Sequence, residues 1–181
     1  MQQRGVVLVE GTSDGRAVET LARRRGRDLE AEGVAIVPMG GYGNLPRVLE
    51  QYRDVPVAGL YDVGEERHFL RALGCADRGE LERSGFYACT RDLEDELTRA
   101  VGPAGMERVL AEQGELRAFG TYQKQLAHRD RPLEEQLHGF MWNRKQRYAV
   151  LLVDALDLER IPRPLDRVLA HLSDQHEHRL E

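Results

Sequence analysis

The sequence has 181 residues, of which 41% are hydrophobic, and this length suits one compact domain with a helical layer added to it. It has no charged and apolar leader and no apolar run long enough to span a bilayer, so we expect a cytoplasmic protein without a membrane partner. The net charge of -5 argues against a protein that coats nucleic acid by bulk attraction. Contact with phosphate groups would therefore require divalent metal to offset the acidic side chains.

Four short apolar segments predict the strands of one parallel sheet. They are rich in branched or aromatic residues, and segments with helical periodicity follow them. Strands that alternate with helices are joined by right-handed crossovers, so we expect an α/β fold in which helices cover both faces of a parallel sheet of about four strands. The predicted strands are residues 6–9, 34–37, 57–61 and 86–89.

The connections between these strands have their own signals. The helix after the first strand is expected to be capped by Thr12 or Ser13 and to run to about Arg25. The glycine-rich loop 40–43 lacks both the dinucleotide fingerprint and the phosphate-loop lysine, so a tight turn explains it equally well. Residues 74–84 are predicted to be a charged connector.

From Gly102 onward the sequence has helical periodicity and no convincing strand. The tail 173–181 is expected to fray. We therefore expect an α/β core over residues 1–101 and a helical extension over residues 102–181, packed on the core as one compact unit. The helical periodicity covers residues 106–110, 116–126, 133–142, 148–156 and 165–172.

Carboxylates follow three of the predicted strands. Glu10 ends the first, Asp62 ends the third, and Asp92 with Glu94 follows the fourth. Acidic residues near a helix start are also explained by capping and by the helix dipole, so each one alone is weak evidence. The ends of neighbouring parallel strands meet at one edge of the sheet, however, and carboxylates that close repel one another unless they share a cation. The pattern predicts an oxygen-rich site for Mg²⁺ or Mn²⁺, with room for two ions.

Other kinds of site have little support. Cys75 and Cys89 are too far apart for a zinc or disulfide framework, and the histidines are scattered without the His-Glu-x-x-His spacing. The sequence has no Gly-x-Ser-x-Gly elbow for a serine nucleophile. Aromatic residues make up 6% and are not interleaved with basic ones, so base stacking is not predicted.

Lysine is rare in this sequence. Lys124 and Lys145 are the two lysines among 26 basic residues. A chain that otherwise uses arginine can retain lysine where a compact ammonium is needed, so both positions are candidates for such a role.

These segments resemble the TOPRIM domain of the OLD family of nucleases, from Val6 to about Leu172. The resemblance implies that Glu10, Asp14, Asp62, Asp92 and Glu94 hold divalent metals, in a site for up to two ions. It also implies that Lys145 stabilises charge on the scissile phosphate, a task that suits an ammonium group. The motifs that carry the resemblance are Val9-Glu10-Gly11-Thr12-Ser13-Asp14, Met39-Gly40-Gly41, Leu60-Tyr61-Asp62, Thr90-Arg91-Asp92-Leu93-Glu94 and Arg144-Lys145-Gln146-Arg147, followed by Ile161-Pro162.

Two features depart from the family pattern. Gly64 stands where the family has the second aspartate of its Asp-x-Asp motif, so that ligand is missing unless Glu65 or Glu66 reaches the site from the start of the next helix. OLD proteins also carry an ATPase domain before this one, whereas this sequence starts at its first strand and has no phosphate-loop motif. We therefore expect any ATPase to be a separate partner.

The sequence thus favours a metal-dependent endonuclease that hydrolyses phosphodiester bonds in DNA, with Glu10 and Lys145 as catalytic residues. Glu10 would serve as a metal ligand and as a general acid or base. An RNA substrate and a homo-oligomer are both left open.

Two alternatives come from other classes. A non-catalytic TOPRIM scaffold that binds nucleic acid or a partner protein is favoured by Gly64 and by the acidic net charge. An unrelated doubly wound regulatory domain with one magnesium ion would place Asp92 and Lys145 far from Glu10.

Overall fold

The computed structural model describes residues 3–177, with side chains described through Leu172. It contains a parallel sheet of four strands in the order β2-β1-β3-β4, as the sequence predicts. The strands are β1 (Gly5–Val9), β2 (Val34–Pro38), β3 (Val57–Asp62) and β4 (Phe86–Cys89). Their bounds agree with the predicted ranges to within one residue.

Strand β1 is buried along its whole length between β2 and β3, which explains its unbroken run of apolar residues. In the sheet, Leu8 of β1 lies beside Gly59 of β3, and Asp62 of β3 lies beside Cys89 of β4. Since all the strands run in one direction, the segments that follow β1, β3 and β4 begin at one edge of the sheet.

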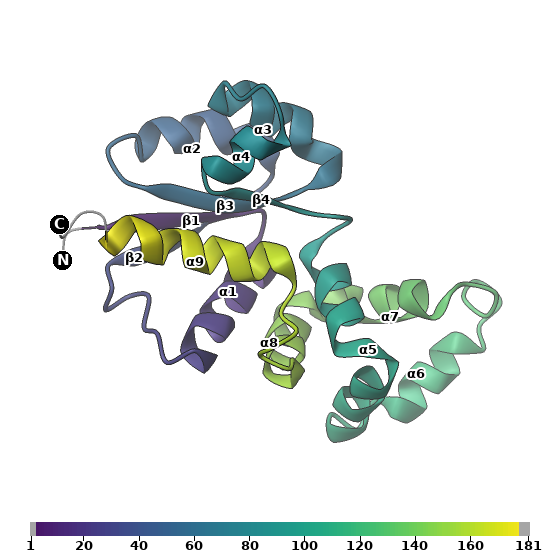
Figure 1. The fold of residues 1–181 in the computed structure, drawn as a ribbon. Coiled ribbons are helices and arrows are strands. Elements are labelled where there is room, and N and C mark those ends of the chain that lie inside the picture. Colours follow the sequence, from purple (N-terminus) through teal and green to yellow (C-terminus); the bar gives the residue numbers. More distant parts are fainter. Residues whose placement is uncertain (1–2, 178–181) are drawn as a thin grey trace.

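One face of the sheet is covered by three short helices (Figure 1). Phe69 from these helices packs between Tyr61 and Phe86 of the strands, at ring-centroid distances of 4.7 and 5.8 Å. The helices are α2 (Leu45–Gln51), α3 (Glu66–Leu73) and α4 (Arg78–Arg83), and single turns of 3-10 helix, η1 (Tyr42–Asn44) and η2 (Val63–Glu65), precede the first two.

Helix α4 lies inside residues 74–84, where the sequence predicts only a connector, and that prediction is wrong. The side chain of Asp77 caps this helix by accepting a hydrogen bond of 2.9 Å from the Glu80 amide. Leu81 is fully buried and fixes the helix to the sheet. With only one buried anchor in a run of charged residues, the helix has no periodic pattern to reveal it.

The opposite face is covered by α1 (Thr12–Arg24) and α9 (Arg163–Glu177), and α8 (Lys145–Ala155) packs against α1 and α5 on the side away from the sheet. In Figure 1 the last helix, drawn in yellow, returns along the sheet beside the first, and it packs against β3 and β4. Arg24 joins α1 to α8 by donating to the carbonyl oxygens of Val153 and Leu156 at 2.7 and 2.8 Å.

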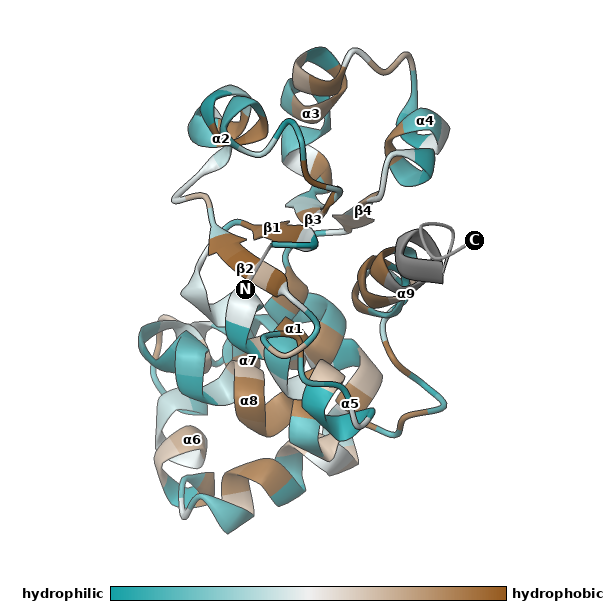
Figure 2. Ribbon diagram, turned by 90° about the vertical axis from the view of Figure 1, so that its left-hand side faces the viewer, coloured by the Kyte–Doolittle hydropathy of each residue, from teal (hydrophilic) through white to brown (hydrophobic). Residues whose placement is uncertain are grey.

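The remaining helices form a second body beyond the edge of the sheet (Figure 1): α5 (Leu93–Glu112), α6 (Leu116–Gln123) and α7 (Leu133–Met141). Helix α5 bends at Gly102, whose φ of 71° no helix allows. Apolar residues of the helices gather on the sides that face the sheet and one another (Figure 2). Within residues 3–177 no strand follows Cys89.

Two further predictions are wrong. Thr12 and Ser13 are the first residues of α1 and cap nothing, because Gly11 holds the cap position and its amide donates to Asp14. Helix α9 continues to Glu177, so the tail does not fray from residue 173, whereas residues 178–181 lie outside the described part. No described helix has the length and apolar character needed to cross a bilayer.

Gly59→Ala should destabilise the fold, because a Cβ on this strand residue would lie 2.9 Å from the Leu8 carbonyl oxygen and 2.9 Å from the Phe86 ring. We expect a loss of about 1–3 kcal/mol in urea unfolding. Gly64→Ala is the matched control: a Cβ there meets nothing within 4 Å, so its stability should stay within about 0.5 kcal/mol of the parent. Equal stability of the two variants would contradict the described packing of β1, β3 and β4.

Candidate functional site

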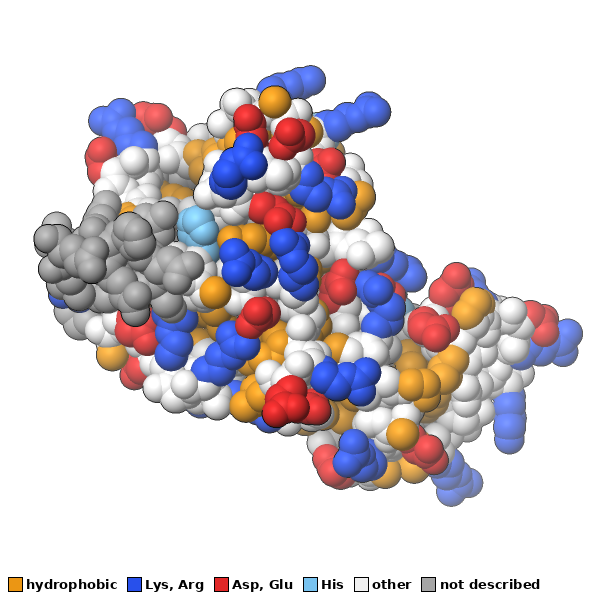
Figure 3. All heavy atoms as spheres, viewed as in Figure 1, with side chains coloured by type: hydrophobic (Ala, Val, Ile, Leu, Met, Phe, Trp, Pro, Cys, Tyr) orange, Lys and Arg blue, Asp and Glu red, His pale blue; other side chains and the backbone are white. Residues whose placement is uncertain are grey.

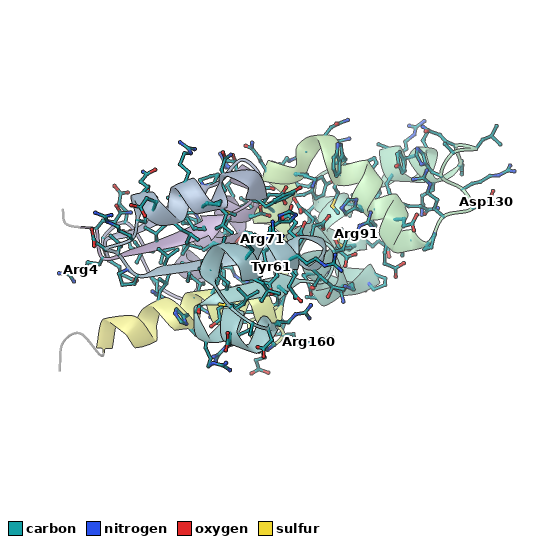
Figure 4. All side chains as sticks on the ribbon, turned by 90° about the horizontal axis from the view of Figure 1, so that it is seen from above. Arg4, Tyr61, Arg71, Arg91, Asp130 and Arg160 are labelled. Atoms are coloured by element: carbon teal, nitrogen blue, oxygen red, sulfur yellow. The ribbon has the colours of Figure 1, made fainter. Side chains whose placement is uncertain are left out.

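A cavity of about 450 Å³ lies at the edge of the sheet where the strands end, and it brings together six of the residues that the sequence singles out. The acidic residues come from the sheet half and the start of α5, whereas Lys145 comes from α8. Figure 4 places Tyr61, which also lines the cavity, midway along the molecule between Arg4 and Asp130. The predicted residues in the lining are Glu10, Asp14, Asp62, Asp92, Glu94 and Lys145.

Asp14 occupies the first turn of α1 and has two roles in one side chain. Its Oδ2 accepts a hydrogen bond of 2.9 Å from the Gly11 amide, which fixes the turn between β1 and α1. Burial, followed by the nearby charge of Glu94, raises the pKa of Asp14 to about 7, although the Gly11 hydrogen bond opposes this change. Asp14 therefore titrates near neutral pH.

Asp62 ends β3 in the middle of the acidic group. Burial, and then repulsion from Glu10, Glu65 and Asp92, raises its pKa to about 8. Glu65 is affected in the same way, since burial and then Glu10 raise its pKa. These carboxylates are close enough to disfavour ionisation of one another, which is the condition under which a shared cation stabilises them.

Asp92 is held by two hydrogen bonds. Its Oδ1 accepts from the Asp95 amide at 2.8 Å and so caps α5, while its Oδ2 lies 2.6 Å from Nε2 of His138 on α7. Burial raises the pKa of Asp92, but the His138 and Asp95 hydrogen bonds and the charge of Lys145 outweigh it, so the pKa falls below its usual value. Asp92 is thus ionised under conditions in which Asp14 and Asp62 still carry protons.

Glu94 and Lys145 form the contact between the two halves of the site. Glu94 is 6% exposed, and its Oε1 has no hydrogen-bond partner among the described residues. Lys145 Nζ lies 3.6 Å from this oxygen and 4.1 Å from the centroid of the Trp142 ring. A buried carboxylate oxygen without a donor is costly unless a cation serves it, so this atom fits a cation-binding role.

The start of α8, which carries Lys145, is anchored by one partly buried carboxylate, that of Glu115. Arg144 and Arg147 each donate from Nη1 to Glu115 Oε1, at 2.6 and 3.0 Å, and the Tyr148 hydroxyl donates to the other oxygen. Burial raises the pKa of Glu115, but these donors outweigh it and lower the pKa overall. The two arginines beside Lys145 therefore fix the start of α8 to the start of α6.

The region of the missing aspartate is open. Gly64 has no atom within 4 Å of a Cβ built on it. Of the two glutamates that follow, Glu66 is engaged elsewhere, because its Oε2 accepts from Arg78 Nε at 2.5 Å and from the Tyr61 hydroxyl at 3.4 Å. Only Glu65 of this pair influences Asp62, through its charge.

The carboxylates line one cavity without closing on one point. Across residues 3–177, no three Asp, Glu, His or Cys side chains are arranged closely enough to hold a single ion. The donor set is made of carboxylate oxygens, which suits Mg²⁺ or Mn²⁺, and Glu94 Oε1, which accepts no hydrogen bond among the described residues, adds a specific point of fit. The assignment of these residues to a metal stays a prediction.

His138 and Trp142 also belong to this site, and the sequence analysis missed both. His138 is 46 positions from Asp92 in the sequence, so no local spacing of histidines and acids reveals their contact. Trp142 did carry a usable signal, since it is the one tryptophan of the sequence and stands three positions before Lys145. The alternative of an unrelated doubly wound regulatory domain required Asp92 and Lys145 to lie far from Glu10. All three residues line one cavity, so that alternative is wrong.

Comparisons with known proteins agree with the resemblance. Residues 3–63 match the family described as "Overcoming lysogenization defect protein-like, TOPRIM domain". The C-terminal region of the Burkholderia pseudomallei OLD protein has a TM-score of 0.72 and 17% identity, covering 96% of this chain and 98% of its own. The C-terminal region of the Xanthomonas campestris pv. campestris OLD protein has a TM-score of 0.75 and 21% identity, covering 98% of this chain and 97% of its own. No curated protein matches the chain.

The family match confirms the resemblance to the OLD-like TOPRIM domain over residues 3–63, and the solved structures confirm the predicted fold class over nearly the whole chain. The matched stretch 3–63 contains Glu10, Asp14 and Asp62. Glu94 and Lys145 lie beyond it, so their assignment depends on the geometry of the cavity.

Asp62→Asn should stabilise the metal-free protein at pH 8 and leave its stability unchanged at pH 4. At pH 4, close to the pKa of about 3.9 of an unfolded aspartate, the carboxyl is neutral in the folded state and half neutral in the unfolded state, so it has little effect on stability. Between that pH and its folded pKa of about 8 it is charged mainly in the unfolded state, so rising pH favours unfolding. We expect the melting temperature at pH 8 to rise by roughly 2–4 °C, allowing for solvent screening of a half-buried group.

The matched control is Asp130→Asn, whose side chain is 84% exposed at the far end of the molecule (Figure 4). Its melting temperature should not change at either pH. A Asp62→Asn variant that melts no higher than the parent at pH 8 would show that the carboxylates are not under electrostatic strain.

Proposed function

We propose that this chain is a divalent-metal-dependent nuclease that hydrolyses phosphodiester bonds in DNA. The observation that carries the proposal is the single cavity in which five carboxylates meet one lysine, with a buried oxygen of Glu94 left without a hydrogen bond among the described residues. The confirmed resemblance to the OLD-like TOPRIM domain supports a nuclease-type protein.

The carboxylates of Glu10, Asp14, Asp62, Asp92 and Glu94 would hold Mg²⁺ or Mn²⁺. When bound, such ions polarise the phosphoryl group and make a water molecule more acidic. The protein contributes the positions of the oxygens, and their closure on an ion requires the side chains to rotate from the described arrangement. Because Asp14 and Asp62 have raised pKa values, metal binding would strengthen as the pH rises toward 8.

Lys145 would stabilise the negative charge that develops on the phosphate oxygens during displacement. Its ammonium is held between the Glu94 carboxylate and the Trp142 ring, and its side chain remains 28% exposed toward the cavity. An ammonium presents a compact charge, whereas the arginines next to it are engaged by Glu115.

Glu10 would act at the mouth of the site. It directly follows the buried strand β1, yet the residue itself is exposed, so its carboxylate can meet both solvent and a bound substrate. This position suits a metal ligand that also moves a proton to or from the attacking water.

A non-catalytic scaffold is the second candidate, and Gly64 is the observation that favours it. The face drawn in Figure 3 adds no strong argument for nucleic-acid binding by charge alone. In the face that Figure 3 shows, acidic and basic side chains alternate over the helices, and none of its regions is uniformly basic. Substrate binding by an active nuclease would therefore depend on the metal in the cavity.

Supercoiled plasmid incubated with the protein and Mg²⁺ or Mn²⁺ should be nicked. Glu10→Ala and Lys145→Ala should each lower the rate by at least about 100-fold, as expected when a group that stabilises transition-state charge is removed. Lys124→Ala, which removes the other lysine from an exposed site outside the cavity, is the matched control and should keep the parent rate. Nicking that survives in both cavity variants would refute the assigned site.

Gly64→Asp should strengthen metal binding, because the open position accepts a side chain and a further carboxylate raises the negative charge of the site. We expect roughly tenfold tighter binding of Mn²⁺ by calorimetry, with Gly64→Ala unchanged. If the aspartate variant also nicks plasmid when the parent does not, the parent is a scaffold that lost one ligand. Unaltered Mn²⁺ affinity would place this turn outside the metal site.

A further inference from the structure

Trp142 stands at the rim of the candidate site with most of its ring uncovered. It is 57% exposed, it lines the same cavity as the carboxylates, and it begins the 3-10 turn η3 (Trp142–Arg144) between α7 and α8. An indole is among the largest apolar groups that a chain can bury, so leaving one exposed beside a polar cavity forgoes a sizeable stabilisation.

The indole contacts Lys145 and His138, the two side chains from the helical half that also contact carboxylates of the site. Lys145 Nζ lies 4.1 Å from the ring centroid, and the His138 ring lies 5.8 Å away. Lys145 also meets Glu94, and His138 meets Asp92. The orientation of the ring is therefore tied to the carboxylates, while much of its surface remains free.

The proposed substrate carries one kind of flat aromatic group into this cavity. Each phosphodiester in a nucleic acid is flanked by sugars that bear bases, so a base next to the reacting phosphate is the group that can reach an aromatic ring at the rim. Stacking on an aromatic side chain is tolerant of sequence, because every base has a π-face.

We propose that Trp142 stacks on an unpaired base beside the reacting phosphate, so that the preferred substrate is single-stranded DNA or an unpaired segment of a duplex. In an intact duplex both faces of each base are covered by neighbouring bases, and stacking on Trp142 would first require the base to be unstacked. This inference rests on the proposed nuclease function and narrows its substrate.

A second exposed ring lies next to the cavity lining. Tyr42 directly follows Gly41, which lines the cavity, and it is 40% exposed. Its ring stacks on His68 with 4.2 Å between the centroids. This pair supports the proposal, since a strand that leaves the cavity on this side would meet an aromatic surface as well.

The single tryptophan makes the contact directly measurable. The parent protein is titrated in Ca²⁺ with a single-stranded thymidine oligonucleotide, with an oligonucleotide of equal length that lacks bases, and with a duplex of that length; a gel verifies that each is intact afterwards. The proposal expects tryptophan fluorescence to be quenched by the thymidine strand and to change little with the abasic strand or the duplex. Equal quenching by the abasic strand would overturn it.

Variants provide the second measurement. Trp142→Ala should weaken binding of the single strand by about 5- to 150-fold, the range that loss of one stacked base implies, and Trp142→Phe should retain most of the affinity. Leu126→Ala, which truncates a side chain that is 79% exposed elsewhere, should bind as the parent does. A Trp142→Ala variant with parental affinity for the single strand would overturn the proposal.

The two proposals fail in different ways. Suppose that metal-dependent nicking of plasmid is lost in Lys145→Ala, while the parent and Trp142→Ala bind single strands equally. The proposed nuclease function then stands, and the stacking role of Trp142 is refuted. Quenching by the thymidine strand without cleavage in any metal would retain the stacking role and remove the nuclease.

Discussion

Repulsion among carboxylates at one edge of the sheet is the constraint that shapes this molecule. The parallel direction of β1, β3 and β4 forces Glu10, Asp62 and Asp92 toward the same cavity, whatever else the chain does. Burial there removes the water that would otherwise screen them, so the pKa values of Asp14 and Asp62 rise to about 7 and 8. Buried carboxylates with raised pKa values are typical of functional sites.

The helical second half supplies the basic side chains that contact the carboxylates of the site. His138 from α7 meets Asp92, and Lys145 from α8 meets Glu94, so each carboxylate at the start of α5 has a partner from the helices. These partners depend on long-range packing. Helix α8 is joined to α1 through Arg24 and to the start of α6 through Glu115, and both contacts help to hold Lys145 at the cavity.

The strands and the acidic residues could be predicted because both follow from local patterns. A buried parallel strand needs an unbroken apolar run, and the residue after it must lie at the edge of the sheet. His138 could not be predicted, since its meeting with Asp92 depends on the bend at Gly102 and on the packing of α7 against α5. The cap of α1 failed for a simpler reason: the helix already begins at Thr12, so Gly11 takes the cap position and the Asp14 side chain accepts from its amide.

The hydrogen bonds of the carboxylates show how the site can be both fixed and adaptable. Asp14 and Asp92 are each oriented by a backbone amide, and Asp92 also by His138, so these two side chains are the more firmly oriented members of the group. A carboxylate has about four lone-pair directions, and these bonds leave at least two of them available on each residue. Glu94 is less fully satisfied, because its buried Oε1 accepts no hydrogen bond among the described residues and has the Lys145 ammonium, 3.6 Å away, as an ion-pair partner. Two acids with fixed orientations and the buried acid Glu94 therefore lie on the cavity that Lys145 lines from α8.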